Sequence, residues 1–217
     1  MPDPFSAFVS SLALLISAAT AWFTLLRRGT VKMTQPTLIV FGLDGKQNSQ
    51  DKRLPKIYLR TLLFSTSKRG RVIEAMHATL SRNESRQTFN IWAHGNKDLV
   101  RGSGLFVNDT GVAQNHHFLT PIDGSHFAFK EGCYDLEVYA KLVGDSKSIR
   151  LWTQKLVVSA VEATKLGQQN CGLYFDWGPA SGQYIAHVEA SPTDVAPEEL
   201  VRMLASNFGG LPNKPIE

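Results

Sequence analysis

The stretch Glu131–Val158, EGCYDLEVYAKLVGDSKSIRLWTQKLVV, decides the fold of this chain. In its first half, apolar side chains alternate with polar ones, which is the period of an antiparallel strand that buries one face. The polar turn GDSK separates this run from a second run of strand-forming residues. We therefore expect a hairpin of residues 133–143 and 148–159. Its inward face is Tyr134, Leu136, Val138 and Ala140, and its outward face carries Asp135, Glu137 and Lys141.

The hairpin resembles the closing hairpin of immunoglobulin-like and fibronectin-type-III-like β-sandwiches, over about residues 131–158. Such domains often carry Gly-x-Tyr-x-Leu-x-Val there, and the pattern appears here as Gly132, Tyr134, Leu136 and Val138. The resemblance implies that Tyr134 is a structural corner whose hydroxyl bonds the backbone upstream. Cys133 precedes the tyrosine, whereas antibody-type domains have a cysteine two residues after it, so no inter-sheet disulfide is implied. A fold-level resemblance carries no function.

Further strands are predicted on both sides of this hairpin, because apolar or alternating runs recur between turn signals. They are residues 37–43, 56–66, 71–81, 86–94, 104–107, 112–119, 126–129, 171–177 and 183–190. The motif NDTG (108–111) is a hairpin turn signal, and the last two strands are expected to pair as another hairpin. Near the end, Asp194 caps a predicted helix in which Leu200, Leu204 and Phe208 share one face.

Residues Phe5–Leu26 contain no charged side chain. As a helix, they extend ~33 Å, which matches the ~30 Å hydrocarbon core of a bilayer. A core helix of a soluble protein normally has a polar face, and this segment has only serine and threonine. A secretory signal has a basic start and a small-residue cleavage site, whereas this chain starts with MPDP and offers no good site. A transmembrane helix is therefore the favoured interpretation.

The orientation of this helix follows from its flanks. Arg27, Arg28 and Lys32 follow it, no Lys or Arg precedes it, and Trp22 lies near the basic pair as interfacial aromatics do. Because positive flanks stay in the cytoplasm, we expect a single-pass inner-membrane protein with its N-terminus outside. These four residues are the predicted membrane-interface residues.

The fold class that follows is mainly β: an antiparallel Ig-like β-sandwich with one N-terminal transmembrane helix and a short C-terminal helix. The predicted organisation has five parts. They are an N-terminal tail (1–4), the transmembrane helix (5–26), a basic juxtamembrane linker (27–36), the sandwich (37–190), and the C-terminal helix and tail (191–217).

The charge distribution argues against a nucleic-acid partner. The net charge is +4, half of it comes from the first 36 residues, and no dense basic stripe remains for the body. Residues 37–110 carry 12 Lys/Arg against 6 Asp/Glu, and residues 111–217 carry 8 against 12, so the body is bipolar. Its densest basic cluster is SKRGR (67–71). This cluster is either a solvated hairpin tip or, if the tip faces the bilayer, a lipid contact through Lys68, Arg69 and Arg71.

The helix itself carries a pattern for self-association. Ala13, Ser17 and Ala21 recur every four residues and so lie along one helix face. Such a stripe lets two helix backbones approach closely, although alanine and serine are also common in monomeric anchors. The pattern is compatible with a homo-oligomer through this helix and with a monomeric anchor.

No catalytic, cofactor or metal residues are assigned, since no P-loop, G-x-S-x-G or H-E-x-x-H motif occurs. His116 and His117 are adjacent in a predicted strand and point to opposite faces. The hypothesis is a non-catalytic cytosolic sandwich that binds or senses a protein partner at the membrane. One alternative is a membrane-tethered enzyme with dispersed His and Asp residues near His116 or His126. Another is an extracytoplasmic ligand-binding module of reversed topology, which a Cys133–Cys171 bond would favour.

Overall fold

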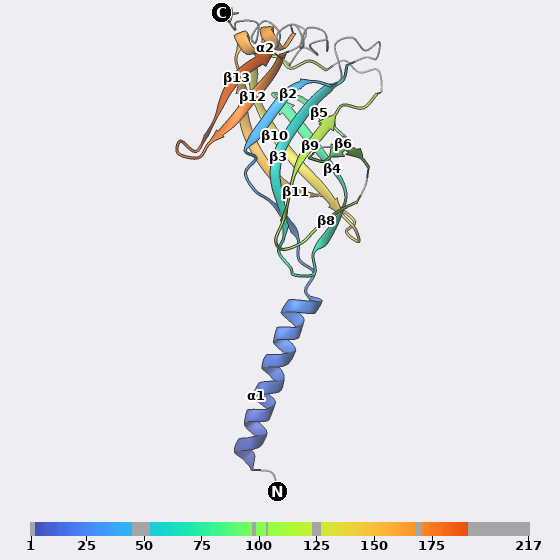
Figure 1. Ribbon diagram of the computed structural model, residues 1–217, viewed down its shortest axis with the longest axis vertical. Coiled ribbons are helices and arrows are strands. Elements are labelled where there is room, and N and C mark those ends of the chain that lie inside the picture. Colours follow the sequence, from blue (N-terminus) through green and yellow to red (C-terminus); the bar gives the residue numbers. More distant parts are fainter. Residues whose placement is uncertain are drawn as a thin grey trace, which may run out of the picture.

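The computed structural model describes residues 3–44, 53–96, 99–102, 104–122, 127–167 and 171–190. Within these ranges the chain forms an N-terminal helix that leads into two facing antiparallel sheets (Figure 1). The mainly β fold class predicted from the sequence is confirmed. The predicted C-terminal helix lies outside the described residues.

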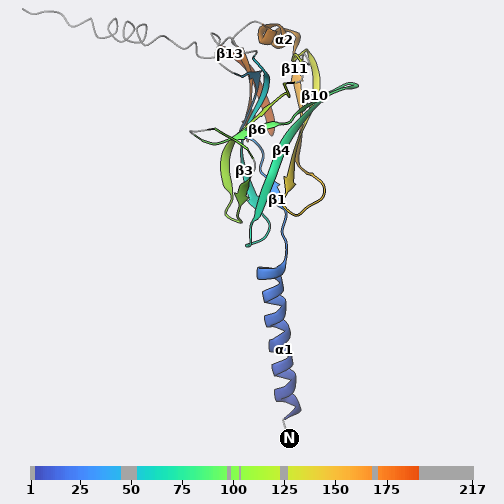
Figure 2. The same cartoon turned by 90° about the vertical axis from the view of Figure 1, so that its right-hand side faces the viewer.

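The N-terminal helix stands alone. It comprises α1 (Pro4–Ala21) and a π-helical continuation, η1 (Trp22–Leu26), and Asp3 caps it by accepting the Phe5 amide at 3.3 Å. No residue of α1 is buried, and the helix projects away from the sheets in both Figure 1 and Figure 2. Residues Pro4–Thr24 are long and apolar enough to cross a membrane. This isolation excludes a packed core helix, and the segment has the features of a membrane anchor or a signal sequence.

The first sheet has the strand order β13-β12-β2-β3-β9-β6-β7, with β1 paired to β3 beside that path. Its strands are β1 (Val31–Met33), β2 (Leu38–Leu43), β3 (Pro55–Ser65), β6 (Ile91–His94), β7 (Val100–Arg101), β9 (Val112–Leu119), β12 (Cys171–Gly178) and β13 (Gln183–Ala190). The second sheet has the order β11-β10-β4-β5, with β8 paired to β4. Its strands are β4 (Arg71–Arg82), β5 (Ser85–Phe89), β8 (Leu105–Val107), β10 (Gly132–Leu142) and β11 (Ile149–Val158).

The core lies between the two sheets and follows the alternation of the sequence. Strands β10 and β11 form the expected hairpin, and the four inward residues of β10 are at most 2% exposed. Phe41 of β2 packs from the opposite sheet, with its ring stacked on Phe129 at 4.9 Å. The predicted inward face of the hairpin is confirmed. The hairpin of β12 and β13 is present as well.

Two strand expectations were wrong about sheet membership. Residues 86–94 form two strands, β5 in the second sheet and β6 in the first, with a break at Asn90. The alternation of buried and exposed positions shifts by one residue at this break. Phe89 and Trp92, which are three positions apart, both face the core. Strands β8 and β9, which flank NDTG, also belong to different sheets, since β8 pairs with β4 and β9 with β3. The turn therefore connects the sheets and closes no hairpin.

Three local elements also differ from expectation. Residues 31–33, expected in the juxtamembrane linker, form β1, because buried Val31 pairs with Ser65. Of the strand expected at 126–129, residues 127–129 are not strand, and His126 lies outside the described residues. An unpredicted helix, α2 (Ala160–Gly167), follows β11. Its signal was a capping box, in which Ser159 Oγ accepts the Glu162 amide and Glu162 Oε2 accepts the Ser159 amide.

Candidate functional site at the helix-proximal end

Residues 27–30, here called the junction, connect the helix to the sandwich and are bonded to the β3–β4 turn (66–70). Ser67 Oγ donates to the Arg27 carbonyl at 3.0 Å, and the Thr66 amide donates to the Thr30 carbonyl at 2.9 Å. Gly29 is buried against this turn, and a Cβ there would lie 2.5 Å from Ser67 Cβ. The sandwich therefore begins directly at the helix end, with no free linker between them.

Arg71 ties the junction to a third segment. Its Nη1 donates to the Gly29 carbonyl at 3.0 Å, and its Nη2 lies 2.8 Å from Asp145 Oδ1 in the β10–β11 turn. The Arg71 side chain is only 12% exposed. Of the three lipid contacts predicted from the sequence, Lys68 and Arg69 are exposed, whereas Arg71 is held inside the protein by these bonds.

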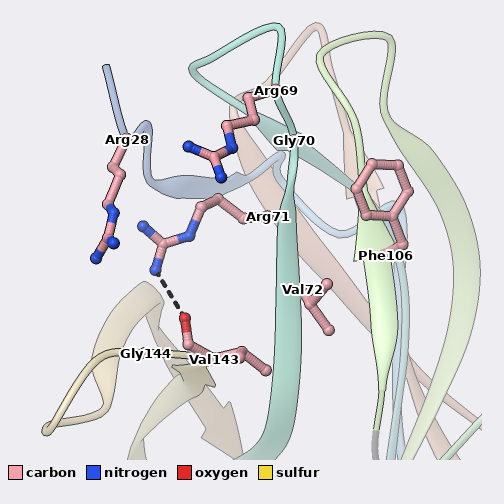
Figure 3. A pocket seen from close by; sticks show the side chains of 8 residues that line it. All are labelled: Arg28, Arg69, Gly70, Arg71, Val72, Phe106, Val143 and Gly144. Atoms are coloured by element: carbon pink, nitrogen blue, oxygen red, sulfur yellow. Dashed lines mark hydrogen bonds between the residues drawn. The ribbon is translucent and has the colours of Figure 1, made fainter. Parts of the chain in front are cut away.

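A pocket of about 380 Å³ lies at this end of the sandwich. Figure 3 shows three arginine side chains on one side of β4, and Val72 and Phe106 on the other. The lining residues are Arg28, Arg69, Gly70, Arg71, Val72, Phe106, Val143 and Gly144. The pocket therefore has a basic side and an apolar side.

Two apolar residues that line the pocket are more than half exposed. Phe106 of β8 is 56% exposed and Val143 is 55% exposed. The ring of Phe106 lies against Gly70, where a Cβ would come within 2.6 Å of Phe106 Cζ. Gly70 also has φ +70°, a conformation that other residues rarely adopt, so glycine permits both the turn and the close approach of the ring.

The four predicted membrane-interface residues lie along the helix end and the first strand. Trp22 is 57% exposed on η1, and the guanidinium of Arg27 lies 6.0 Å from the Phe23 ring centroid. Arg28 lines the pocket, and Lys32 is exposed on β1. The residues that follow the helix and the residues of the β3–β4 turn thus place positive charges at the same end of the molecule.

These cations lack carboxylate partners. Among the described residues, no Asp or Glu forms an ion pair with Arg28, Lys32, Lys68 or Arg69. The Asp145 carboxylate at this end is already paired with Arg71. Arg28 and Arg69 therefore offer guanidinium groups with free donors at the mouth of a partly apolar pocket.

Sequence reasoning missed Phe106 and Val143 as part of this site. A usable signal existed for Phe106, since Leu105 and Val107 both face inward and the residue between them must face out. An outward phenylalanine in a short strand is a candidate contact residue. No local pattern linked Val143 to Phe106, because only the fold brings their strands to the same end.

The described histidines do not line this pocket, and the ring centroids of His94 and His116 lie 6.5 Å apart. His116 is fully buried and accepts a hydrogen bond on Nδ1 from Trp92 Nε1 at 3.2 Å, and burial lowers its pKa to about 3. His117 points to the other face, where burial and the nearby charge of Lys56 lower its pKa to about 4. In the described ranges, no group of three or more His, Cys, Asp and Glu residues is arranged to hold a metal ion. His116 is a packing residue of the core.

Tyr134 and the two cysteines complete the predicted set. The Tyr134 hydroxyl donates to the Lys130 carbonyl at 2.8 Å and accepts the Lys130 amide at 2.9 Å. Cys133 is exposed, Cys171 is partly buried, and both are free thiols. A second cavity, of about 240 Å³, lies beside Tyr134 at the far end of β4 and β10. Two of its arginines are engaged, Arg82 with the Glu131 carbonyl and Arg86 with Glu137.

No protein-family model matches this chain, and no curated protein matches it. Among solved structures, it is similar to the CooA pilin subunit from enterotoxigenic Escherichia coli. The similarity covers 60% of this chain and 98% of that chain, with 11% sequence identity and a TM-score of 0.30. Similarity at this level supports no statement about function.

Proposed function

We propose that this is a single-pass inner-membrane protein that holds its sandwich in a defined orientation against the cytoplasmic membrane surface, where the domain binds or senses a protein partner without catalysis. The observation that carries the proposal is the bonded junction. Four residues separate the helix from β1, and three of them are hydrogen-bonded to the β3–β4 turn or to Arg71.

A hydrogen-bonded junction fixes the orientation of a domain relative to its anchor, whereas a flexible junction does not. A flexible linker lets a domain sample many orientations and distances from its anchor. Here the Ser67–Arg27 and Arg71–Gly29 hydrogen bonds restrict the direction in which the sandwich leaves the helix. The helix-proximal end therefore faces the membrane, and the opposite end is presented to partners.

The charges near the helix support the cytoplasmic orientation. Arg27, Arg28 and Lys32 follow the helix directly, and the fold adds exposed Lys68 and Arg69 close to them. Asp3 is the one charged side chain among residues 1–4. Because positively charged flanks are retained in the cytoplasm, the sandwich belongs on that side.

The sandwich is also proposed to be a variant of the immunoglobulin-like and fibronectin-type-III-like folds. The β10–β11 hairpin and the two hydrogen bonds between the Tyr134 hydroxyl and the Lys130 backbone support this relationship. The relationship concerns architecture only, so the functional proposal does not depend on it.

The orientation is tested by labelling a thiol. Cys171→Ser leaves exposed Cys133 as the single thiol of the chain. A maleimide that cannot cross membranes is expected to label Cys133 only after the cells are permeabilised. Labelling in intact cells would contradict the proposal and favour an extracytoplasmic module. As a control, replacing Arg27, Arg28 and Lys32 with Gln and Asp3 with Lys should move labelling toward intact cells.

The partner is tested by loosening the junction. A Gly-Ser segment inserted between Gly29 and Thr30 frees the sandwich from its orientation and leaves its fold in place. Gentle detergent extraction after crosslinking in cells should recover partner proteins with the wild type and fewer with the insertion variant. Identical recovery from both proteins would show that orientation at the membrane plays no part in binding.

A further inference from the structure

We propose that the pocket between Arg28, Arg69 and Phe106 binds the headgroup of an anionic phospholipid from the same bilayer that holds α1. The inference rests on the proposed membrane anchoring and assigns a ligand to the helix-proximal end. The phosphate lies on the basic side of the pocket, and the start of the acyl chains lies on the apolar side.

The basic side suits a phosphate group. Arg28 and Arg69 are exposed, line the same pocket, and have no carboxylate partner among the described residues. Guanidinium groups bind phosphate oxygens through paired N–H donors, so these two side chains can attract and bind a phosphodiester. Arg71 serves a different purpose, because Asp145 and Gly29 already occupy its donors.

The apolar side suits a lipid and not a soluble anion. A site for a free phosphate has no use for Phe106 and Val143, both of which are more than half exposed. Next to a bilayer, these two side chains are covered by the glycerol and upper acyl region of a lipid, which removes their apolar surface from water. The pocket volume of about 380 Å³ lies within the range of small-molecule sites, ~300–1,000 Å³.

The position of the pocket supplies the remaining argument. Arg28 is the second residue after η1 and lines the pocket, so the pocket lies beside the point where the chain leaves the helix. The hydrogen bonds of the junction hold Arg69 and Arg28 near each other, although 41 positions separate them in the sequence. A lipid bound there contacts both the helix end and the sandwich and reinforces the orientation that the junction sets.

The experiment uses the full chain in nanodiscs of phosphatidylcholine alone or mixed with phosphatidylglycerol. Native mass spectrometry counts the lipids that remain bound when the protein is released from the disc. The wild type is expected to retain phosphatidylglycerol beyond its share of the bilayer. Arg69→Gln and Arg28→Gln should each lower that excess about fivefold, the effect of one basic residue at an anionic surface. Arg101→Gln makes the same change on exposed β7 and should behave like the wild type.

Two further measurements separate a lipid from a free anion. Phe106→Ser keeps every charge and should also reduce retention, because it removes the apolar contact. Glycerol 3-phosphate in solution should not displace the lipid, and displacement at concentrations similar to those of the lipid would overturn the lipid assignment in favour of a simple phosphate site. Equal retention of phosphatidylglycerol by Arg69→Gln and Arg101→Gln would show that the lipid does not bind in this pocket.

The same samples distinguish this inference from the proposed anchoring. Failure of the protein to co-elute with the nanodiscs would overturn the membrane anchoring and the inference together. Co-elution without an excess of phosphatidylglycerol would overturn the lipid site alone. Circular dichroism of each variant confirms that the sandwich is folded; the side chains of Arg28 and Arg69 are exposed, so both variants should pass this check.

Discussion

Tyr134 joins the start of β10 to the segment that precedes it. Its ring is buried, and its hydroxyl both donates to and accepts from the backbone of Lys130. Tyr134→Phe keeps the ring and removes both hydrogen bonds. We expect the free energy of unfolding of a fragment starting at residue 27 to fall by about 1 kcal/mol, the typical net contribution of a hydrogen bond.

Tyr139→Phe is the matched control for this prediction. Its hydroxyl donates to Glu137 on the outer face of the sheet, at 3.0 Å, and Arg150 continues to bind the same carboxylate at 2.7 Å when the hydroxyl is removed, so no group is left unpaired. Thermal melts of the two variants should therefore differ. Equal midpoints for Tyr134→Phe and the wild type would mean that the hydroxyl contributes nothing to the stability of the fold.

His116 makes the stability of the sandwich depend on pH. Its pKa is about 3 in the folded chain, against 6.5 for an ordinary histidine, because burial disfavours the charged ring. The unfolded chain therefore takes up a proton below pH 6.5 that the folded chain refuses until about pH 3. The contribution is fully present above pH 6.5 and is lost as the pH falls, by about 2 kcal/mol at pH 5.

The measurement compares His116→Gln with the wild type. Glutamine is neutral, and its carbonyl oxygen can still accept from Trp92 Nε1, so the variant loses the titrating group and keeps an acceptor. Denaturant unfolding at pH 7.5 and pH 5 should give a smaller difference for the variant. Parallel pH profiles for the two proteins would assign the acid sensitivity to other groups.

At the scale of elements, the connection between the helix and the β3–β4 turn depends on Gly29. A Cβ at this position would lie 2.5 Å from Ser67 Cβ and 2.6 Å from the Ser67 nitrogen, so the backbone must move. In Gly29→Ala we expect overpacking of ~1–3 kcal/mol to separate the junction from the turn. The Thr66 amide, which donates to the Thr30 carbonyl, should then exchange its hydrogen about 5- to 100-fold faster.

Gly167→Ala provides the control at the end of α2. A Cβ there meets nothing within 4 Å, so the same substitution should leave exchange in the β3–β4 turn unchanged. Comparable protection of Thr66 in Gly29→Ala and Gly167→Ala would mean that the junction tolerates a side chain. The sandwich would then not depend on this contact for its direction.

Short elements were the hardest to assign from the sequence. Strands β3, β4 and β10 are long enough for their alternation to be read locally, and their expected bounds agree with the structure within one residue at each end. The break at Asn90 could not be predicted in this way. Phe89 and Trp92 belong to opposite sheets, yet the nine residues 86–94 alternate well enough to suggest a single strand. Sheet membership is a tertiary property and leaves little local trace.

At the scale of the whole molecule, an isolated helix and a sandwich at its end raise the question of self-association. Ser11, Thr20 and Thr24 each donate a hydrogen bond to the carbonyl four residues earlier. Ser17 makes no such bond in the described structure, so its hydroxyl is available to a second helix. We predict that full-length chains pair through the stripe of Ala13, Ser17 and Ala21.

Ser17→Leu tests the pairing, because leucine blocks close approach of the backbones and keeps the helix apolar. Crosslinking in membranes should show a smaller dimer fraction for this variant than for the wild type. Ala19→Leu adds bulk on the opposite face of the helix and should leave the fraction unchanged. Equal dimer fractions for Ser17→Leu and the wild type would exclude this stripe as the contact.

The sequence alone determined the features that depend on neighbouring residues. The charge-free run from Phe5 to Leu26, the alternation in β10 and the hairpin of β12 and β13 are local patterns, because a helix or strand faces its surroundings with a short, regular period. The cationic character of residues 27–32 and 67–71 was equally visible. Of the candidate site, the sequence thus supplied the basic residues.

Only the tertiary structure decided how those residues are used. Arg71 belongs to the same basic cluster as Arg69, yet its hydrogen bond to Asp145, 74 positions away, gives it a structural role. Phe106 and Val143 join Arg28 because β8, β4 and β10 pair in one sheet. The physical reason is that contacts between distant segments depend on which strands pair and in which register, and that choice minimises the free energy of the whole core. No short window of residues contains it.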